Sequence, residues 1–410
     1  MATRFFKNAV VLGLLSAVGP FAIDMYLPTL PTIARDLHAS TFATQMTLMA
    51  FFIAFGVCQI AYGPASDMVG RKPPLYFGLG LFLLGSIGCS LAPGIAWLIA
   101  FRVLQGIGAA AAVVIPRAII RDLHTGIEAT RLMAFVMLVF SVSPILAPLA
   151  GSALIVPFGW RAVFVAVTIA AALAMVLVTT LLPETRTREQ RVNASIGGAL
   201  RGFGRLFGHG RFLGLTFIGG LGMSSFFAFL ASSSFIYINH FGLTPTQYSL
   251  AFSVNAIGFI GASQFAATLG GRFGMARVVI AAVSCYAFFA LLQIATLIAG
   301  VDNLATLMAL LFCTFAFLGL VIPSTMVLAL EDQGPIAGTA AALGGALQML
   351  TGGLVIAVVS VFADGSPRPM ATAICACSLG ALTLTYVFLV RRKNSGSAGA
   401  MIAQASSKAG

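Results

Sequence analysis

One acidic residue, Asp24, lies inside the first long apolar stretch of the chain. A carboxylate at the centre of a membrane-spanning helix costs about 2.5–3.5 kcal/mol on insertion scales. Ionisable groups at such a depth face a bundle interior or a water-filled path, where they take part in transport. Asp24 is therefore our candidate proton-coupling residue. The alternative is an acid at a helix end that is capped at the membrane interface, because Pro28 follows four residues later.

A basic residue, Arg102, lies in the fourth long apolar stretch, three residues before Gln105. Its guanidinium group stays charged at physiological pH and needs an acceptor or water at membrane depth. Two interpretations stay open. Arg102 acts electrostatically on Asp24, with Gln105 beside it, in proton coupling and substrate binding. Alternatively, it is a structural arginine satisfied by backbone carbonyls and Gln105.

A polar loop after the second apolar stretch carries an acid and a base. Asp67 and Arg71 are four residues apart, which places them within reach of each other on one helical turn. Gly63 and Gly70 allow a tight turn, and Asp122, at the end of the fourth stretch, offers Arg71 a second acceptor. We expect these five residues to form a conformational latch; ordinary loop charges are the alternative.

The fifth apolar stretch contains Pro144, Pro148 and Gly151. Each proline lacks an N–H and interrupts the helical hydrogen bonds, while the glycine allows a close approach of another helix. A bent span of this kind could restrict leakage when a transporter opens. The alternative is a helix that is merely kinked and packed.

The composition excludes a soluble globular protein. The chain has 410 residues, of which 59% are hydrophobic and 8% charged, and its mean hydropathy is +1.02. Soluble domains carry about 25% charged residues. Apolar runs of about 20 residues indicate membrane-spanning helices. They predict an all-α membrane protein with twelve spans, at about 8–30, 43–64, 75–93, 96–118, 132–155, 162–182, 212–236, 246–268, 277–299, 304–328, 336–362 and 370–390.

The net charge of +12 and the pI of about 10.0 are explained by the arrangement of basic residues on one side of a membrane, and they do not indicate a nucleic-acid partner. With twelve spans and a cytoplasmic N-terminus, only Arg35, Arg161 and Arg368 of the loop arginines and lysines fall on the outer side. Cytoplasmic loops carry such an excess of Lys and Arg. The distribution predicts that both termini are cytoplasmic.

The spans divide into two sets of six, and two short segments recur. Residues 55–61 resemble residues 260–266, and residues 114–116 resemble residues 321–323, at equivalent places in the two halves. Paired matches of this kind indicate an internal duplication. The polar interruption between the sets predicts this organisation: an N-terminal six-helix bundle at 1–185, a cytoplasmic linker at 186–210, a C-terminal six-helix bundle at 211–392 and a disordered cytoplasmic tail at 393–410.

Four segments carry a resemblance to a known family. The loop at 63–73 resembles the signature between spans two and three of the major facilitator superfamily, and residues 98–108 resemble its span-four motif, with Arg102 as the intramembrane arginine. Residues 143–151 resemble the span-five motif of drug/proton antiporters, with Ala147 where glycine is commoner. Residues 24–28, with Gly159-Trp160-Arg161, resemble the bicyclomycin/chloramphenicol-resistance branch of twelve-span exporters.

The resemblance implies two pseudo-symmetric six-helix bundles with a substrate site between them. It implies proton-coupled efflux of a lipophilic or amphiphilic drug across the bacterial inner membrane, with protons, the drug and the lipid bilayer as partners. We expect a monomer with no cofactor and no metal. One alternative is an exporter of a small metabolite such as a sugar or amino acid. A membrane-embedded enzyme would need a nucleophile with its base, or metal-ligand spacing inside the spans, and the sequence offers neither.

Overall fold

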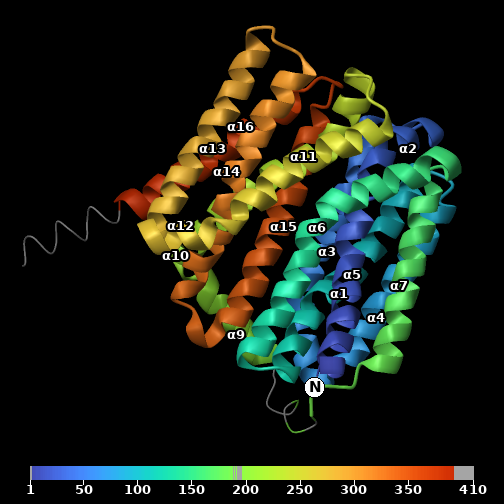
Figure 1. Ribbon diagram of the computed structural model, residues 1–410, viewed down its shortest axis with the longest axis vertical. Coiled ribbons are helices and arrows are strands. Elements are labelled where there is room, and N and C mark those ends of the chain that lie inside the picture. The colour runs from blue at the N-terminus through green and yellow to red at the C-terminus, as the bar shows by residue number, and fades with distance from the viewer. Residues whose placement is uncertain (1, 188, 190, 192–195, 392–410) are drawn as a thin grey trace, which may run out of the picture.

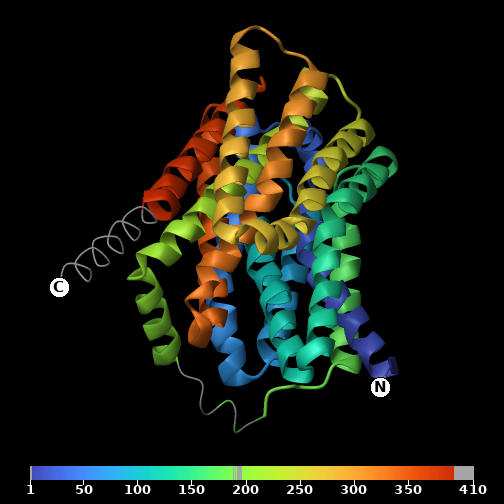
Figure 2. The ribbon, with the colours of Figure 1, turned by 60° about the vertical axis from the view of Figure 1, so that its left-hand side comes forward.

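The computed structural model describes residues 2–187, 189, 191 and 196–391, and every regular element within these residues is helical (Figures 1 and 2). Twelve helices are long and apolar enough to cross a membrane, so the predicted number of spans is confirmed. The predicted tail at 393–410 and linker residues 188, 190 and 192–195 lie outside the described residues.

The first six spans form one bundle, and several of them run a few residues beyond the predicted ends. The first span continues from its main helix through a short 3-10 turn and a further helix. The elements are α1 (Ala2–Asp24) with η1 (Leu27–Thr29) and α2 (Leu30–Asp36), α3 (Thr41–Val69), α4 (Lys72–Leu91), α5 (Ile95–Leu123), α6 (Gly126–Phe158) and α7 (Arg161–Leu181).

The last six spans form the second bundle. The elements are α10 (Gly210–Ser234) with the π-helix η2 (Phe235–His240), α11 (Pro245–Gln264) with α12 (Ala266–Phe273), α13 (Met275–Ile298), α14 (Leu304–Glu331), η3 (Gly334–Ile336), α15 (Ala337–Val361), and α16 (Arg368–Thr385) with the π-helix η4 (Tyr386–Arg391). Between the bundles, the predicted linker contains a further helix, α9 (Ile196–Phe207).

Local sequence signals set several helix ends. The Ser40 side chain accepts the Ala43 N–H at the start of α3, and Thr244 and Gln247 form a reciprocal capping box at the start of α11. Gly70 ends α3 with φ of 103°, a conformation that favours glycine. After the sharp turn at Gly70, α4 begins two residues later, at Lys72.

The two bundles meet mainly along α3 and α15 and along α6 and α11. We call the end that holds the N-terminus proximal and the opposite end, where α2 lies, distal (Figures 1 and 2). Hydrogen bonds between the bundles lie toward the distal end, where α3 and α11 begin. Gln45 Nε2 donates to the Ala231 carbonyl at 2.9 Å, and Ser249 Oγ donates to the Pro148 carbonyl at 2.8 Å. The structure is therefore joined across its distal end.

In each bundle, a glycine brings an equivalent pair of spans close together. In the first bundle, a Cβ at Gly106 on α5 would collide with the Phe51 carbonyl oxygen on α3. In the second, a Cβ at Gly319 on α14 would collide with the Phe259 carbonyl oxygen on α11. The same pairs of spans, two with four and eight with ten, thus pack through a glycine in both halves, as expected of a duplicated fold.

We expect Gly319→Ala to lower the thermal unfolding midpoint in detergent, because overpacking of this kind costs about 1–3 kcal/mol. Gly261→Ala, on α11, is the matched control, because nothing lies within 4 Å of the added Cβ. In the control, alanine removes the backbone entropy cost of glycine, so the midpoint should stay or rise. Equal midpoints for both variants would show that the close approach at Gly319 is not required.

Candidate functional site

Asp24 is buried at the distal end of α1. It is the last residue of that helix, and only 6% of the residue is exposed. Ser143 Oγ on α6 donates to Asp24 Oδ2 at 3.2 Å. Asp24 thus ends a helix, as one interpretation of the sequence expected, but the bundle encloses it, as expected of a residue inside the membrane. Every other Asp and Glu of the chain lies near a span end or in a loop.

Arg102 is fully buried on α5 and lies between two aromatic rings. Its guanidinium carbon is 4.5 Å from the Tyr26 ring centroid and 4.4 Å from that of Phe51, within the range of cation–π attraction. Nη1 donates to the Ala22 carbonyl at 3.2 Å and to Gln105 Oε1 at 2.5 Å. The rings, one carbonyl and one amide therefore replace part of the water that the cation would otherwise require.

No hydrogen bond or ion pair joins Asp24 to Arg102 in the described part of the chain; the Ala22 carbonyl, two residues before Asp24, is the acceptor instead. The hydrogen bonds of Arg102 match those of the structural alternative, a backbone carbonyl and Gln105. Nε and Nη2 are buried without a partner among the described residues. An electrostatic action of Arg102 on Asp24 stays a prediction.

The residues of the predicted latch lie together at the proximal end. Arg71 Nη1 donates to Asp67 Oδ1 at 2.7 Å, and Arg71 Nε donates to Asp122 Oδ2 at 2.7 Å. The turn at Gly70 brings Arg71 to the first residues of α4, and Gly63 has open space around it. These contacts join α3, α4 and α5 within the first bundle, so they do not by themselves bridge the two halves.

Glu184 is a member of this cluster that the sequence analysis missed. Its carboxylate accepts the backbone N–H groups of Arg71 at 2.9 Å and Lys72 at 3.0 Å, so it caps α4 from a distance of more than a hundred residues. Burial raises the pKa of Glu184, but the N–H groups of Lys72, Arg71 and Arg186 and the Arg191 guanidinium outweigh it and hold that pKa below 4.5. An acid immediately after an apolar span was the only available signal.

The span-five motif lies where α6 meets both α1 and α11. A Cβ at Gly151 would collide with the Met25 carbonyl oxygen, next to Asp24. Near Pro144, the Ile145 carbonyl accepts Ser253 Oγ–H from α11 at 3.0 Å, and Pro148 itself accepts the Ser249 hydroxyl. The motif therefore supplies backbone acceptors to the second half as well as the bends expected of two prolines.

An aromatic cluster in the second half lies near the junction. Phe226 on α10 is half-buried, and its ring centroid is 5.6 Å from that of Phe259 and 5.7 Å from that of Phe315. At the seam with the first half, Phe227 stacks on Phe52 of α3 at 4.1 Å. A partly exposed aromatic ring with ring neighbours suits an apolar ligand.

Arg117 is a second arginine within the fourth span and was not singled out from the sequence. It lies on α5 toward the proximal end, with its guanidinium carbon 5.6 Å from the Phe140 ring centroid. Its Nε is buried without a partner in the described residues. A charged residue six positions before the end of the apolar helix α5 was a readable signal.

The geometry defines a polytopic helical membrane protein with two six-span halves, the first of which buries an acid and an arginine. The sequence profile of the Major Facilitator Superfamily matches residues 12–359, and the chain belongs to that family. The MFS-type transporter YdgK of Bacillus subtilis strain 168 is 36% identical, over 86% of this chain and 88% of its own length. A bicyclomycin resistance protein homolog of Haemophilus influenzae strain Rd is 30% identical, over 93% of this chain and 96% of its own length.

The crystal structure of a D-xylose-proton symporter has the same fold. Its TM-score is 0.71 and its sequence identity is 18%, over 92% of this chain and 97% of the symporter chain.

We expect Glu184→Gln to lower the thermal unfolding midpoint at neutral pH, because charged hydrogen bonds contribute about 1.5–3 kcal/mol each before solvent screening reduces them. Because folding lowers the pKa of Glu184, its ionised carboxylate stabilises the folded protein at pH values above the unfolded-state pKa of 4.5. That stability is lost as the pH falls through the lower folded value, so the gap to the unmodified protein should close there.

Glu128→Gln, at the more exposed partner of His124, is the control for the removal of one proximal carboxylate. Melting curves from pH 7 down to pH 3 provide the measurement. A gap for Glu184→Gln that keeps its size down to pH 3 would contradict the capping role.

Proposed function

We propose that this protein exports a lipophilic or amphiphilic drug, of the bicyclomycin or chloramphenicol kind, in exchange for protons. Its membership in the Major Facilitator Superfamily supports transport over catalysis. The similarity to a bicyclomycin resistance protein homolog supports drug efflux. The aromatic cluster around Phe226 supports an apolar cargo over a sugar or amino acid, which would need more hydrogen-bonding groups.

One observation carries the proton coupling. Asp24 is a buried carboxyl group with one hydroxyl donor among the described residues, Ser143, and it lies where α1, α6 and the second half meet. Protonation removes the charge that burial penalises. A proton on Asp24 would therefore favour a conformation that encloses this residue, and loss of the proton would favour one that exposes it to water.

The cycle follows from alternating access between bundles 1–185 and 211–392. We assign the proximal end to the cytoplasm of a bacterial cell, with both termini there and the protein acting as a monomer. The distal hydrogen bonds would then hold the outer side closed. Each elementary charge that moves inward across the membrane gains about 2.3 kcal/mol per 100 mV, before any pH gradient is counted.

The proximal cluster of Asp67, Arg71 and Asp122 would act as a latch within the first bundle. It holds the ends of α3, α4 and α5 together, and Glu184 and Arg186 tie the start of the linker to it. Because the linker leads to the second half, the cluster can bias the relative position of the halves without touching the second bundle itself.

We expect drug-sensitive bacteria that express the protein to gain resistance in a susceptibility panel that includes chloramphenicol and bicyclomycin. We expect Asp24→Asn to abolish that resistance at equal expression, since the amide cannot exchange a proton. Asp36→Asn, at the distal end of the same span, is the control and should retain most resistance.

Everted vesicles test the coupling directly. Adding the exported drug should dissipate an imposed acid gradient in vesicles with the unmodified protein and leave the gradient intact with Asp24→Asn. If the Asp24→Asn variant kept full resistance, Asp24 would not be the coupling residue, but the proposed transport function would remain.

We expect Asp67→Lys to reduce efflux at least tenfold while leaving expression near normal, because it places a like charge beside Arg71 at a contact of 2.7 Å. Glu128→Lys, also proximal and ion-paired with His124, is the control. The measurement is drug efflux from loaded cells. Efflux by Asp67→Lys at the control rate would refute the latch.

A further inference from the structure

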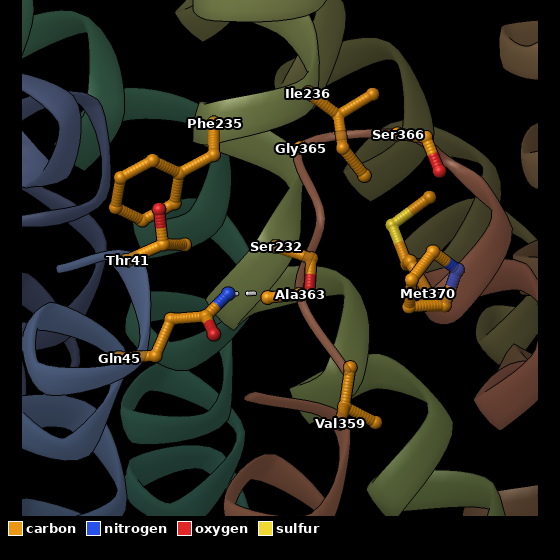
Figure 3. Close-up of a pocket in the computed structure, with 11 residues that line it drawn as sticks. Thr41, Gln45, Ser232, Phe235, Ile236, Val359, Ala363, Gly365, Ser366 and Met370 are labelled. Atoms are coloured by element: carbon orange, nitrogen blue, oxygen red, sulfur yellow. Dashed lines mark hydrogen bonds between the residues drawn. The ribbon is translucent and has the colours of Figure 1, made fainter. Parts of the chain in front are cut away.

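The spaces between the helices differ in size at the two ends of the molecule. At the distal end, a pocket lined by Gln45 of α3 and Ser232 of α10 has a volume of about 10 Å³, which is room for about one water molecule (Figure 3). At the proximal end, a groove between α3 and the linker helix α9 has a volume of about 480 Å³. Ligand pockets have volumes of about 300–1,000 Å³. The proximal groove is therefore large enough for a ligand, and the distal pocket is not.

The walls of the proximal groove are apolar. The α3 wall includes Ile60 and Pro64 and ends at Val69, the last residue of that helix. Leu200 and Phe203 of α9 form the opposite wall, and every residue that lines the groove is apolar. Val69 and Leu200 are exposed, so the groove is open to its surroundings. Exposed apolar surface of this kind marks a contact with a membrane or another apolar partner.

The helix α9 is amphipathic. Leu200, Phe203 and Phe207 recur at intervals of three and four residues, which places them on one face of the helix. Arg201 and Arg205 are four residues apart and lie on another face. A helix with an apolar face and a basic face lies in the plane of a membrane interface, with its apolar face at the acyl boundary. Because α9 lies beside the end of a membrane span, it is placed at the depth of such an interface.

A further side of α9 packs against the second half. Leu206 is fully buried, and a Cβ at Gly202 would lie 3.4 Å from Thr339 Cγ2 on α15. The helix contacts both α15 and α10. The other wall of the groove, α3, belongs to the first half. An occupant of the groove would therefore lie between the first half and a helix that packs on the second.

The arginines of α9 are exposed and form no ion pair within residues 2–187, 189, 191 and 196–391. Arg201 Nε donates to the Gly197 carbonyl of its own helix at 3.2 Å. By contrast, Arg211 at the start of α10 pairs with Asp332 at 2.7 Å. Arg201 and Arg205 thus stand beside an apolar groove without a carboxylate to neutralise them. Such a combination is complementary to a ligand that joins an anionic group to a hydrocarbon chain.

We propose that this groove binds one anionic phospholipid. An acyl chain lies between α3 and α9, and the phosphate accepts hydrogen bonds from Arg201 and Arg205. Arginine side chains are long enough to hold their charge at the level of the headgroups while their stems cover apolar surface. The net negative charge of the lipid favours it over a zwitterionic one. The site is independent of proton coupling by Asp24 and of the identity of the exported drug.

The test measures lipid binding to the purified full-length protein in a neutral detergent at low salt. The readout is the thermal unfolding midpoint, because a ligand that binds the folded state raises this midpoint. We expect short-chain phosphatidylglycerol to raise the midpoint until the site is saturated. Phosphatidylcholine with the same chains, and glycerol phosphate, which has no chains, should leave it nearly unchanged.

Removal of the charges tests the headgroup contacts. We expect Arg201→Gln combined with Arg205→Gln to weaken the apparent affinity for phosphatidylglycerol about tenfold or more. The matched control combines Arg272→Gln with Arg277→Gln. It removes two exposed arginines, on α12 and α13, that lie outside the groove wall, and it should keep the original affinity.

Filling the groove tests the contact with the acyl chain. Ala61 is an exposed residue of the α3 wall. We expect Ala61→Trp to weaken the same affinity about fivefold or more, because the indole ring occupies the space of several methylene groups. Ala281→Trp, at an exposed alanine of α13 outside the groove wall, is the control and should bind as the unmodified protein does.

The outcomes separate the possible ligands. An affinity that neither the charge variant nor Ala61→Trp weakens would overturn the site. An equal shift with phosphatidylcholine would show that the groove does not select an anion, and an equal shift with glycerol phosphate would make the ligand a free anion rather than a lipid. Drug susceptibility and the acid gradient are measured separately, so each of these failures would leave the proposed export intact.

Discussion

The structure depends on the cost of holding ionisable side chains in a medium where water is scarce. Asp24 and Arg102 both lie inside apolar spans, and each is enclosed by atoms that replace part of its hydration. Arg102 receives two aromatic faces, a carbonyl and an amide. Asp24 receives one hydroxyl group. This difference is the basis of the two roles that we propose, a cation that is held in place and an acid that exchanges a proton.

The two halves are joined by interactions that can separate. Side-chain hydroxyl and amide groups of one half donate to backbone carbonyls of the other, at Ala231, Ile145 and Pro148. Bonds of this neutral kind contribute about 0.5–1.5 kcal/mol each. A few of them can close one end of the molecule without preventing it from opening. The charged contacts at the proximal end, by contrast, are internal to the first bundle and its linker.

Local patterns predicted much of the architecture. Run length and composition predicted the twelve spans, and the four-residue spacing of Asp67 and Arg71 predicted a contact that the structure contains. Glu184 and Ser143 could not be found in this way. Their partners lie more than a hundred residues away in the sequence. No local spacing between residues can predict such a distant contact of a single hydroxyl or carboxyl group.

The sequence by itself determined which parts of the chain enter the membrane and which few of them carry charge, because hydrophobicity and charge are properties of each residue. Only the tertiary structure decided that Asp24 is hydrogen-bonded to Ser143 rather than to Arg102, and that η1, which follows Asp24, packs against α10 and α11 of the other half. Those relations depend on how two bundles pack and rotate against each other. Local composition places no constraint on that arrangement.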